Sequence, residues 1–175
     1  MKRLVLLPLI ALTLVACRDT ATGPTRVPGG PQLVVATSID QSGGLHFTKG
    51  PDATATKTST SAFLTATGEV AGAGTTATAT LAADVAVTSG CINRGSKDQQ
   101  PSGLQRTTTT TSGQQTFNTR SGRGSFKVST DAVTVNRTCP DQMTPVLVSA
   151  TFTNVTLTIT SGPKTLIAHF PDIDP

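Results

Sequence analysis

Apolar and polar residues alternate with a period of two along most of the chain. In the clearest stretch, residues 76–91, the odd positions hold Ala, Leu or Val apart from Ser89 and the final Cys91, while Thr is the commonest residue at the even positions. Successive side chains of a strand point to opposite faces, so one face of this segment is buried and the other is polar. The pattern predicts a long strand, with Cys91 in phase with its buried face.

Shorter alternating runs predict further strands, separated by sequences rich in Gly, Ser, Asn and Pro. The runs are residues 33–37, 53–67, 105–117, 125–135 and 165–170, and the turn-rich sequences are 41–44, 71–74, 93–103, 118–124 and 161–163. No stretch shows helical spacing. Seven or eight strands with such turns predict an all-β, antiparallel β-sandwich of immunoglobulin-like type, with a small β-barrel as the alternative.

The apolar positions change phase near the C-terminus. They are even at Val146, Val148, Ala150 and Phe152 but odd at Val155, Leu157 and Ile159. Because a shift of one residue turns a side chain to the other face of a sheet, we expect a β-bulge or a strand break around Thr153–Asn154.

Thr is unusually abundant, with 34 residues in the chain, and residues 107–111 are five Thr in succession. β-Branched side chains fit a pleated surface, so we interpret this run as an exposed strand, the alternative being a low-complexity loop. Small Ala side chains and Thr methyl groups are expected to fill a thin core.

The N-terminal residues have the features of a secretion signal. Lys2 and Arg3 precede an apolar run, residues 4–15, that is too short to span a bilayer comfortably. The sequence Leu-Val-Ala-Cys that ends at Cys17 resembles the lipobox of bacterial lipoproteins. The resemblance implies cleavage before Cys17 and acylation of that residue, which anchors the chain in a membrane. An ordinary signal peptide is the alternative.

These features divide the chain into three parts. Residues 1–16 are the expected signal peptide, and residues 17–31 are the lipidated Cys17 followed by a flexible tether with three Pro and three Gly. Residues 32–175 are the expected single β-sandwich domain. Because Arg18 and not Asp follows the Cys, the family resemblance implies the outer membrane, if the organism has one.

Charge and aromatic content exclude some binding partners. Removal of Lys2 and Arg3 with the signal leaves 12 basic against 10 acidic side chains, which predicts no steering toward nucleic acid. The chain contains six Phe and neither Tyr nor Trp. Sugar binding is therefore disfavoured, because sugar and single-strand nucleic-acid sites use exposed aromatic faces.

Cys91 and Cys139 remain after the lipidation site is set aside. An even pair of Cys in an exported chain predicts a disulfide, which stabilises by about 4 kcal/mol on the chain-entropy model; two unpaired buried thiols are the alternative. The spacing of these Cys and of His46 and His169 lacks a ligand pair, so we expect no metal site and no cofactor.

Three stretches resemble a set of uncharacterised secreted bacterial proteins rich in β-structure. They are residues 67–74, residues 90–95 at the end of the long predicted strand, and Cys139-Pro140 followed by residues 148–157. The likeness covers about 90 residues and departs from the set at residues 96–101. It implies a β fold with the two Cys paired, and it implies no activity.

No arrangement of residues predicts catalysis. The nucleophile motif Gly-x-Ser-x-Gly is absent. Ser161 and Lys164 match Ser-x-x-Lys, but a Pro between them places the pair in a turn and not on the helix that this motif requires. His46 and His169 are candidate general bases with no carboxylate close in sequence. We therefore expect that the protein is not an enzyme.

Two further candidate binding elements remain. Arg120 and Arg123 lie in a Gly-rich turn and are candidates for clasping a phosphate or carboxylate, the alternative being a solvated hairpin tip. Asp172 and Asp174 are the carboxylates of an acidic C-terminus, which we expect to be frayed.

The sequence thus predicts a lipid-anchored protein of the cell envelope that serves as a structural or protein-interaction module. Its contacts are the membrane, through acyl chains on Cys17, and an envelope protein that adds a strand to a polar, Thr-rich edge. The alternative is a lipoprotein that binds a small ligand or ion.

Overall fold

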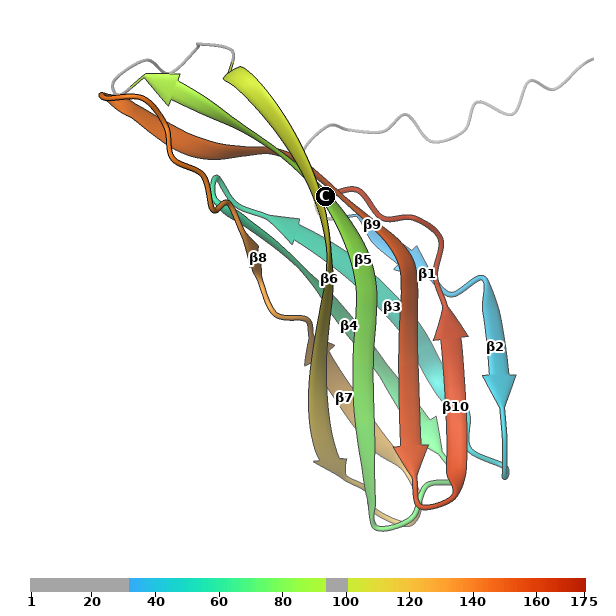
Figure 1. The fold of residues 1–175 in the computed structure, drawn as a ribbon. Coiled ribbons are helices and arrows are strands. Elements are labelled where there is room, and N and C mark those ends of the chain that lie inside the picture. Colours follow the sequence, from blue (N-terminus) through green and yellow to red (C-terminus); the bar gives the residue numbers. More distant parts are fainter. Residues whose placement is uncertain (1–31, 94–100) are drawn as a thin grey trace, which may run out of the picture.

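Two antiparallel sheets pack face to face in the computed structural model, which describes residues 32–93 and 101–175 (Figure 1). One sheet has the strand order β1-β3-β4-β7, with β8 also pairing with β4, and the other has the order β2-β10-β9-β5-β6. The strands are β1 (Leu33–Val35), β2 (Ser38–Gln41), β3 (His46–Lys57), β4 (Ser61–Ala71), β5 (Thr76–Asn93), β6 (Ser102–Asn118), β7 (Gly124–Ser129), β8 (Val133–Thr134), β9 (Met143–Ser161) and β10 (Lys164–His169).

The expected β-sandwich is confirmed, and over the described ranges the sheets do not close into a barrel. The connections have one notable feature. In immunoglobulin domains the first two strands share a sheet, whereas here β1 and β2 lie in different sheets. The chain then returns to the sheet of β1, where β3 and β4 form a hairpin, before it crosses to β5. The described part of the chain contains no helix with the length and apolarity needed to cross a membrane.

The core is built from the alternating positions that the sequence indicated. In β5 the odd-numbered residues from Ala77 to Val87 are buried, as predicted. Ser89, the next odd-numbered residue, is buried as well although it is polar. Alanines contribute many of the buried apolar side chains: Ala53, Ala55, Ala62, Ala66, Ala71, Ala77, Ala79, Ala83, Ala150 and Ala168. Alanine therefore fills much of the core, as the sequence predicted.

Two predicted strands are each divided in two, so those expectations were wrong. Residues 53–67 belong to β3 and β4, which meet at a turn where the Thr58 hydroxyl accepts hydrogen bonds from the N–H groups of Thr60 (3.2 Å) and Ser61 (2.9 Å). Residues 125–135 are interrupted at Thr130, whose hydroxyl accepts from Leu64 N–H (3.1 Å). Thr promotes strands and also closes such turns, so alternation alone concealed both breaks.

The predicted phase change in β9 is confirmed as a bulge. Ala82 of β5 lies opposite Thr156 while Asp84 lies opposite Thr153, and Asn154 has a positive φ of 52°. A second irregularity follows between Thr88 and Ser89 of β5. It places Leu147 in the core and leaves Val146 and Val148 only partly buried, so the expectation of one even-numbered inward face up to Phe152 was wrong.

The predicted disulfide between Cys91 and Cys139 is present, with a Cα–Cα separation of 5.9 Å.

The C-terminus is ordered against the sheet, so the expectation that it is frayed was wrong. Ile173 is fully buried, and its N–H and carbonyl each bond to Phe152 of β9 at 2.9 Å. One apolar residue between Asp172 and Asp174 therefore holds the acidic end in place.

Candidate functional site

Strand β6 is the outermost strand of its sheet and pairs only with β5 along its length. Ser112 shows which backbone groups of β6 point away from β5. The carbonyl of Ser112 accepts a hydrogen bond from Asp131 N–H (3.0 Å) and therefore points to the side opposite β5. Alternate residues of a strand direct their N–H and C=O groups to opposite edges. The even-numbered residues of β6 therefore point away from β5.

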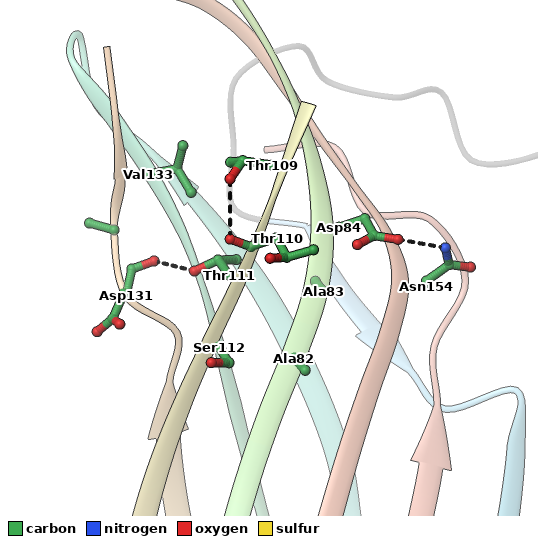
Figure 2. A pocket seen from close by; sticks show the side chains of 11 residues that line it. Ala82, Ala83, Asp84, Thr109, Thr110, Thr111, Ser112, Asp131, Val133 and Asn154 are labelled. Atoms are coloured by element: carbon green, nitrogen blue, oxygen red, sulfur yellow. Dashed lines mark hydrogen bonds between the residues drawn. The ribbon is translucent and has the colours of Figure 1, made fainter. Parts of the chain in front are cut away.

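The C-terminal part of β6 is covered by the other sheet. A Cβ at Gly113 would lie 1.8 Å from the carbonyl oxygen of Ser129, so only glycine permits this approach. Nearby, the Thr111 hydroxyl donates to the carbonyl of Asp131 (2.7 Å), as Figure 2 shows. The backbone N–H of Lys127 adds a bond to Oε1 of Gln115 (3.0 Å). We call residues 111–118 the closed half of β6.

Residues 104–110 have no such cover, and we call them the open edge. All of them are exposed. No described residue bonds to the backbone N–H or C=O of Arg106 or Thr108, and the carbonyl of Thr110 has only a long contact from the Thr109 hydroxyl (3.4 Å). Natural sheets protect such edges with Lys, Pro or bulges. Apart from the register shift at its first residue, Leu104, the open edge has none of these, and it carries one charge, Arg106.

Two hollows follow this edge. The larger, of about 520 Å³, lies around residues 109–112 and is bordered by residues 131–133 and by Asp84 and Asn154 (Figure 2). The smaller, of about 160 Å³, extends along residues 105–109 and is lined by Val87 and by residues 133–136. They share Thr109 and Val133, so together they form a groove beside the exposed backbone.

Just beyond Asn136, which lines the smaller hollow, the chain is tied to β5. Arg137 donates from Nη1 to the carbonyl of Ser89 on β5 (3.2 Å), and two residues later Cys139 is bonded to Cys91. The close approach of Gly113 limits the other end of the groove. The groove therefore lies between these two fixed points and has a partly apolar lining that includes Val87 and Val133.

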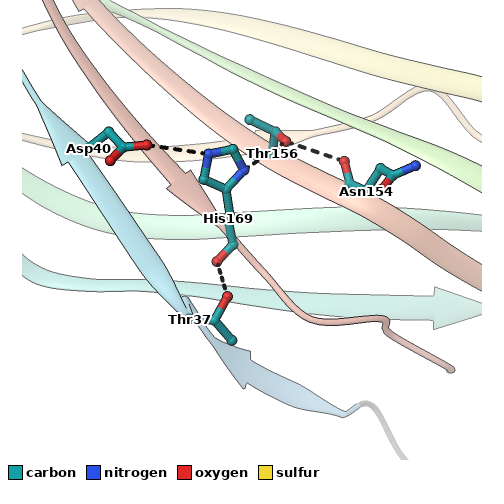
Figure 3. A network of polar contacts seen from close by, with 5 residues as sticks. All are labelled: Thr37, Asp40, Asn154, Thr156 and His169. Carbon is teal, nitrogen blue, oxygen red and sulfur yellow. Dashed lines mark hydrogen bonds and ion pairs between the residues drawn. The ribbon is translucent and has the colours of Figure 1, made fainter.

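The outer face of the same sheet carries a polar network (Figure 3). The structure gives His169 a carboxylate that the sequence did not show: its Nε2 lies 3.6 Å from Oδ2 of Asp40, and its Nδ1 lies 3.5 Å from the Thr156 hydroxyl. Both contacts are long, and the side chains of His169 and Asp40 are 46% and 76% exposed. The network links β2, β10 and β9 on a solvated surface and does not isolate a base from water.

The bulge in β9 extends this polar surface. Asn154 accepts from the Thr156 hydroxyl through its carbonyl (3.3 Å), and its Nδ2 donates to Oδ2 of Asp84 (2.8 Å). Its positive φ turns the side chain toward β5 and to the border of the larger hollow. The bulge therefore supplies polar groups beside β6.

Arg120 and Arg123 lie together at one end of the sandwich. Each donates its backbone N–H to the other's carbonyl, at 2.8 and 3.0 Å, around a turn in which Ser121 and Gly122 have positive φ. Both border a cleft of about 360 Å³ with Glu69. The structure thus brings the two predicted Arg to one cleft, and it adds a carboxylate that the sequence did not place there.

The remaining residues singled out in the sequence have structural contacts. Ser161 Oγ donates to the Thr76 carbonyl and accepts from Gly74 N–H, each at 2.8 Å, and Lys164 donates to the Gly72 carbonyl (2.6 Å). His46 Nδ1 lies 3.0 Å from the Gly44 carbonyl. These contacts hold turns at one end of the sandwich.

Two further findings concern the predicted lipidation site and metal binding. Cys17, the signal and the tether lie outside the described residues. Within the described ranges, no cluster of three or more His, Cys, Asp or Glu side chains could hold a metal ion.

In comparisons with known proteins, no family model, no curated protein and no solved structure matches this chain. The geometry of the open edge and its groove therefore carries the functional argument.

Proposed function

We propose that the protein is a lipid-anchored cell-envelope protein whose β-sandwich binds another polypeptide by strand addition to the open edge of β6. The observation that carries this proposal is the row of outward-pointing backbone groups at Arg106, Thr108 and Thr110, which no other described strand covers. An extended partner satisfies these groups through main-chain hydrogen bonds. Its alternate side chains enter the groove lined by Val87 and Val133.

The proposed location, at a membrane of the cell envelope, rests on the N-terminal sequence. The basic start, the short apolar run and the Leu-Val-Ala-Cys sequence support acylation at Cys17, and residues 18–31 supply a tether between membrane and domain. Replacing Cys17→Ser tests the anchor: the protein should leave the membrane fraction, and the wild-type mass should include acyl chains. Wild-type protein without acyl chains would contradict this part of the proposal.

Substitution of Thr108 tests strand addition. Pro lacks an N–H and is tolerated where that group faces away from the sheet, so Thr108→Pro should fold normally and lose envelope partners in a cross-linking capture. Thr108→Val keeps the N–H and should retain them. Strand addition at this edge is excluded if both variants capture every partner equally, copies of this chain included, or if the wild type captures no polypeptide at all.

A second candidate function rests on the cleft at Arg120 and Arg123. Two guanidinium groups beside a 360 Å³ cleft suit a small carboxylate or phosphate, while Glu69 at the same cleft opposes an anion. Thermal unfolding with acetate, citrate and inorganic phosphate tests it. A rise in melting temperature that disappears in the Arg120→Ala/Arg123→Ala variant supports binding, and a flat response rejects it.

A further inference from the structure

The open edge is symmetric about its central residue. Arg106 and Thr108 point outward one position on either side of Thr107. Thr110 and Leu104 stand three positions away on either side, with Leu104 at the register shift where the regular pairing with β5 begins. When two such edges meet in antiparallel orientation with Thr107 opposite Thr107, each outward-pointing residue faces another one. Leu104 then faces Thr110 and Arg106 faces Thr108, and each of the two Arg106–Thr108 pairs can form two backbone hydrogen bonds.

The closed half of β6 limits the possible registers. The carbonyl of Ser112 is already bonded to Asp131, so an added strand cannot extend past that position. At the other end, β6 bends at Gly103, which has a positive φ of 60° and lies at a register shift. Between these limits, the register centred on Thr107 uses every outward-pointing residue of the open edge and leaves Ser112 outside the pairing.

Charge and side-chain type also suit pairing between identical edges. Arg106 is the one charged residue of the open edge, and in this register it faces Thr108 of the other copy and not a second Arg106. Opposing Thr side chains are favourable neighbours across strands, whereas like charges placed directly opposite are not. The inward-facing Thr107 and Thr109 of the second copy add small β-branched side chains beside the groove.

We propose that the strand added to the open edge is β6 of a second copy of this chain, antiparallel and related by a two-fold axis at Thr107. This inference rests on the proposed function and names its partner. The contact is isologous, so it closes as a dimer and does not propagate into a fibre. Anchoring of both copies in one membrane raises their effective concentration and favours a contact made mainly by backbone hydrogen bonds.

Single cysteines test the register in the full chain carrying Cys17→Ser. Thr107→Cys places the new thiol opposite its own copy in a pair whose Cα atoms lie about 4.5 Å apart, so oxidation should yield a covalent dimer on a non-reducing gel. Thr109→Cys is the matched control: it lies on the same face, but the two copies of it are about 13 Å apart, because four residues separate them along the strand. Thr116→Cys, in the closed half, should also remain monomeric.

Two outcomes overturn the dimer. In one, Thr107→Cys stays monomeric; in the other, Thr109→Cys or Thr116→Cys cross-links as efficiently as Thr107→Cys. Adding Thr108→Pro to Thr107→Cys should abolish cross-linking, and undiminished cross-linking in that variant means that the copies do not meet through β6 backbone bonds.

The same variants separate this inference from the proposed function. Loss of another envelope protein on Thr108→Pro, with no Thr107→Cys dimer, leaves strand addition intact and rejects self-association. If Thr108→Pro alters neither capture nor cross-linking, strand addition itself fails.

Discussion

The two halves of β6 belong to one continuous strand and have different surroundings. Thr occupies four of the seven positions of the open edge and two of the eight of the closed half, and β6 pairs with β5 without interruption from Gln105 to Asn118. Gly113 marks the difference, because its missing side chain lets the backbone of Ser129 approach, and the Asp131 segment then covers the strand. The comparison teaches that one small residue in an edge strand can decide whether its neighbouring backbone is covered or left available to a partner.

The same contrast holds for β9. Beyond the end of β10, its edge is covered at Phe152 by two backbone bonds to Ile173. The fold therefore covers an exposed edge on one side of the sheet and leaves seven residues of β6 uncovered on the other. This difference is the reason to assign binding to the open edge.

The largest expected effect comes from removing the disulfide just beyond the groove. The Cys91→Ala/Cys139→Ala variant should lose about 4 kcal/mol of unfolding free energy, since the unfolded chain is freed from a 48-residue separation. Urea unfolding of wild type and variant measures this. Dithiothreitol should destabilise the wild type alone, and a variant as stable as the oxidised wild type contradicts the prediction.

Gly113→Ala tests the closed half directly. The added methyl meets the Ser129 carbonyl and the Thr130 Cα, both backbone atoms that cannot move aside cheaply, so we expect a loss of about 3 kcal/mol. The variant should also give faster amide exchange at Asp131, whose bond to Ser112 depends on this approach. Thr110→Ala in the open edge serves as the control and should change stability little.

The sequence predicted the parts of the fold that depend on alternation. The long strand β5, the bulge at Asn154 and the pairing of Cys91 with Cys139 all follow from side-chain period and Cys number. Thr58 could not be recognised as a turn residue, because a Thr that caps a turn and a Thr in a strand have the same local sequence pattern.

The candidate site was predictable only in part. The Thr run indicated a polar edge, but the groove depends on Val133 and Asp131, which reach β6 from the other sheet. Such contacts between sheets leave no local pattern. Gly113 within a Thr-rich strand was the available signal, because an isolated strand glycine often marks a close approach of another backbone.

A matched pair of substitutions tests a smaller difference in stability between the two halves of β6. Thr111 and Thr108 lie in the same Thr run, but only Thr111 is buried and donates its hydroxyl to the Asp131 carbonyl. Thr111→Val should therefore cost about 1 kcal/mol, while Thr108→Val should change the unfolding free energy by less than about 0.5 kcal/mol. Equal effects in urea unfolding would show that the closed half gains nothing from this bond.

The last prediction concerns amide hydrogen exchange in the unaltered chain. At protein concentrations low enough to keep the chain monomeric, the N–H groups of Thr107 and Thr109 should be protected because they face β5, while those of Thr108 and Thr110 should exchange at rates near those of an unfolded chain. In the closed half, protection should not follow this alternation as strictly. Raising the concentration should protect Thr108 and Thr110 if β6 pairs with its copy. Equal protection of all four amides at low concentration would mean that the edge is already covered, and the contrast between the two halves would then disappear.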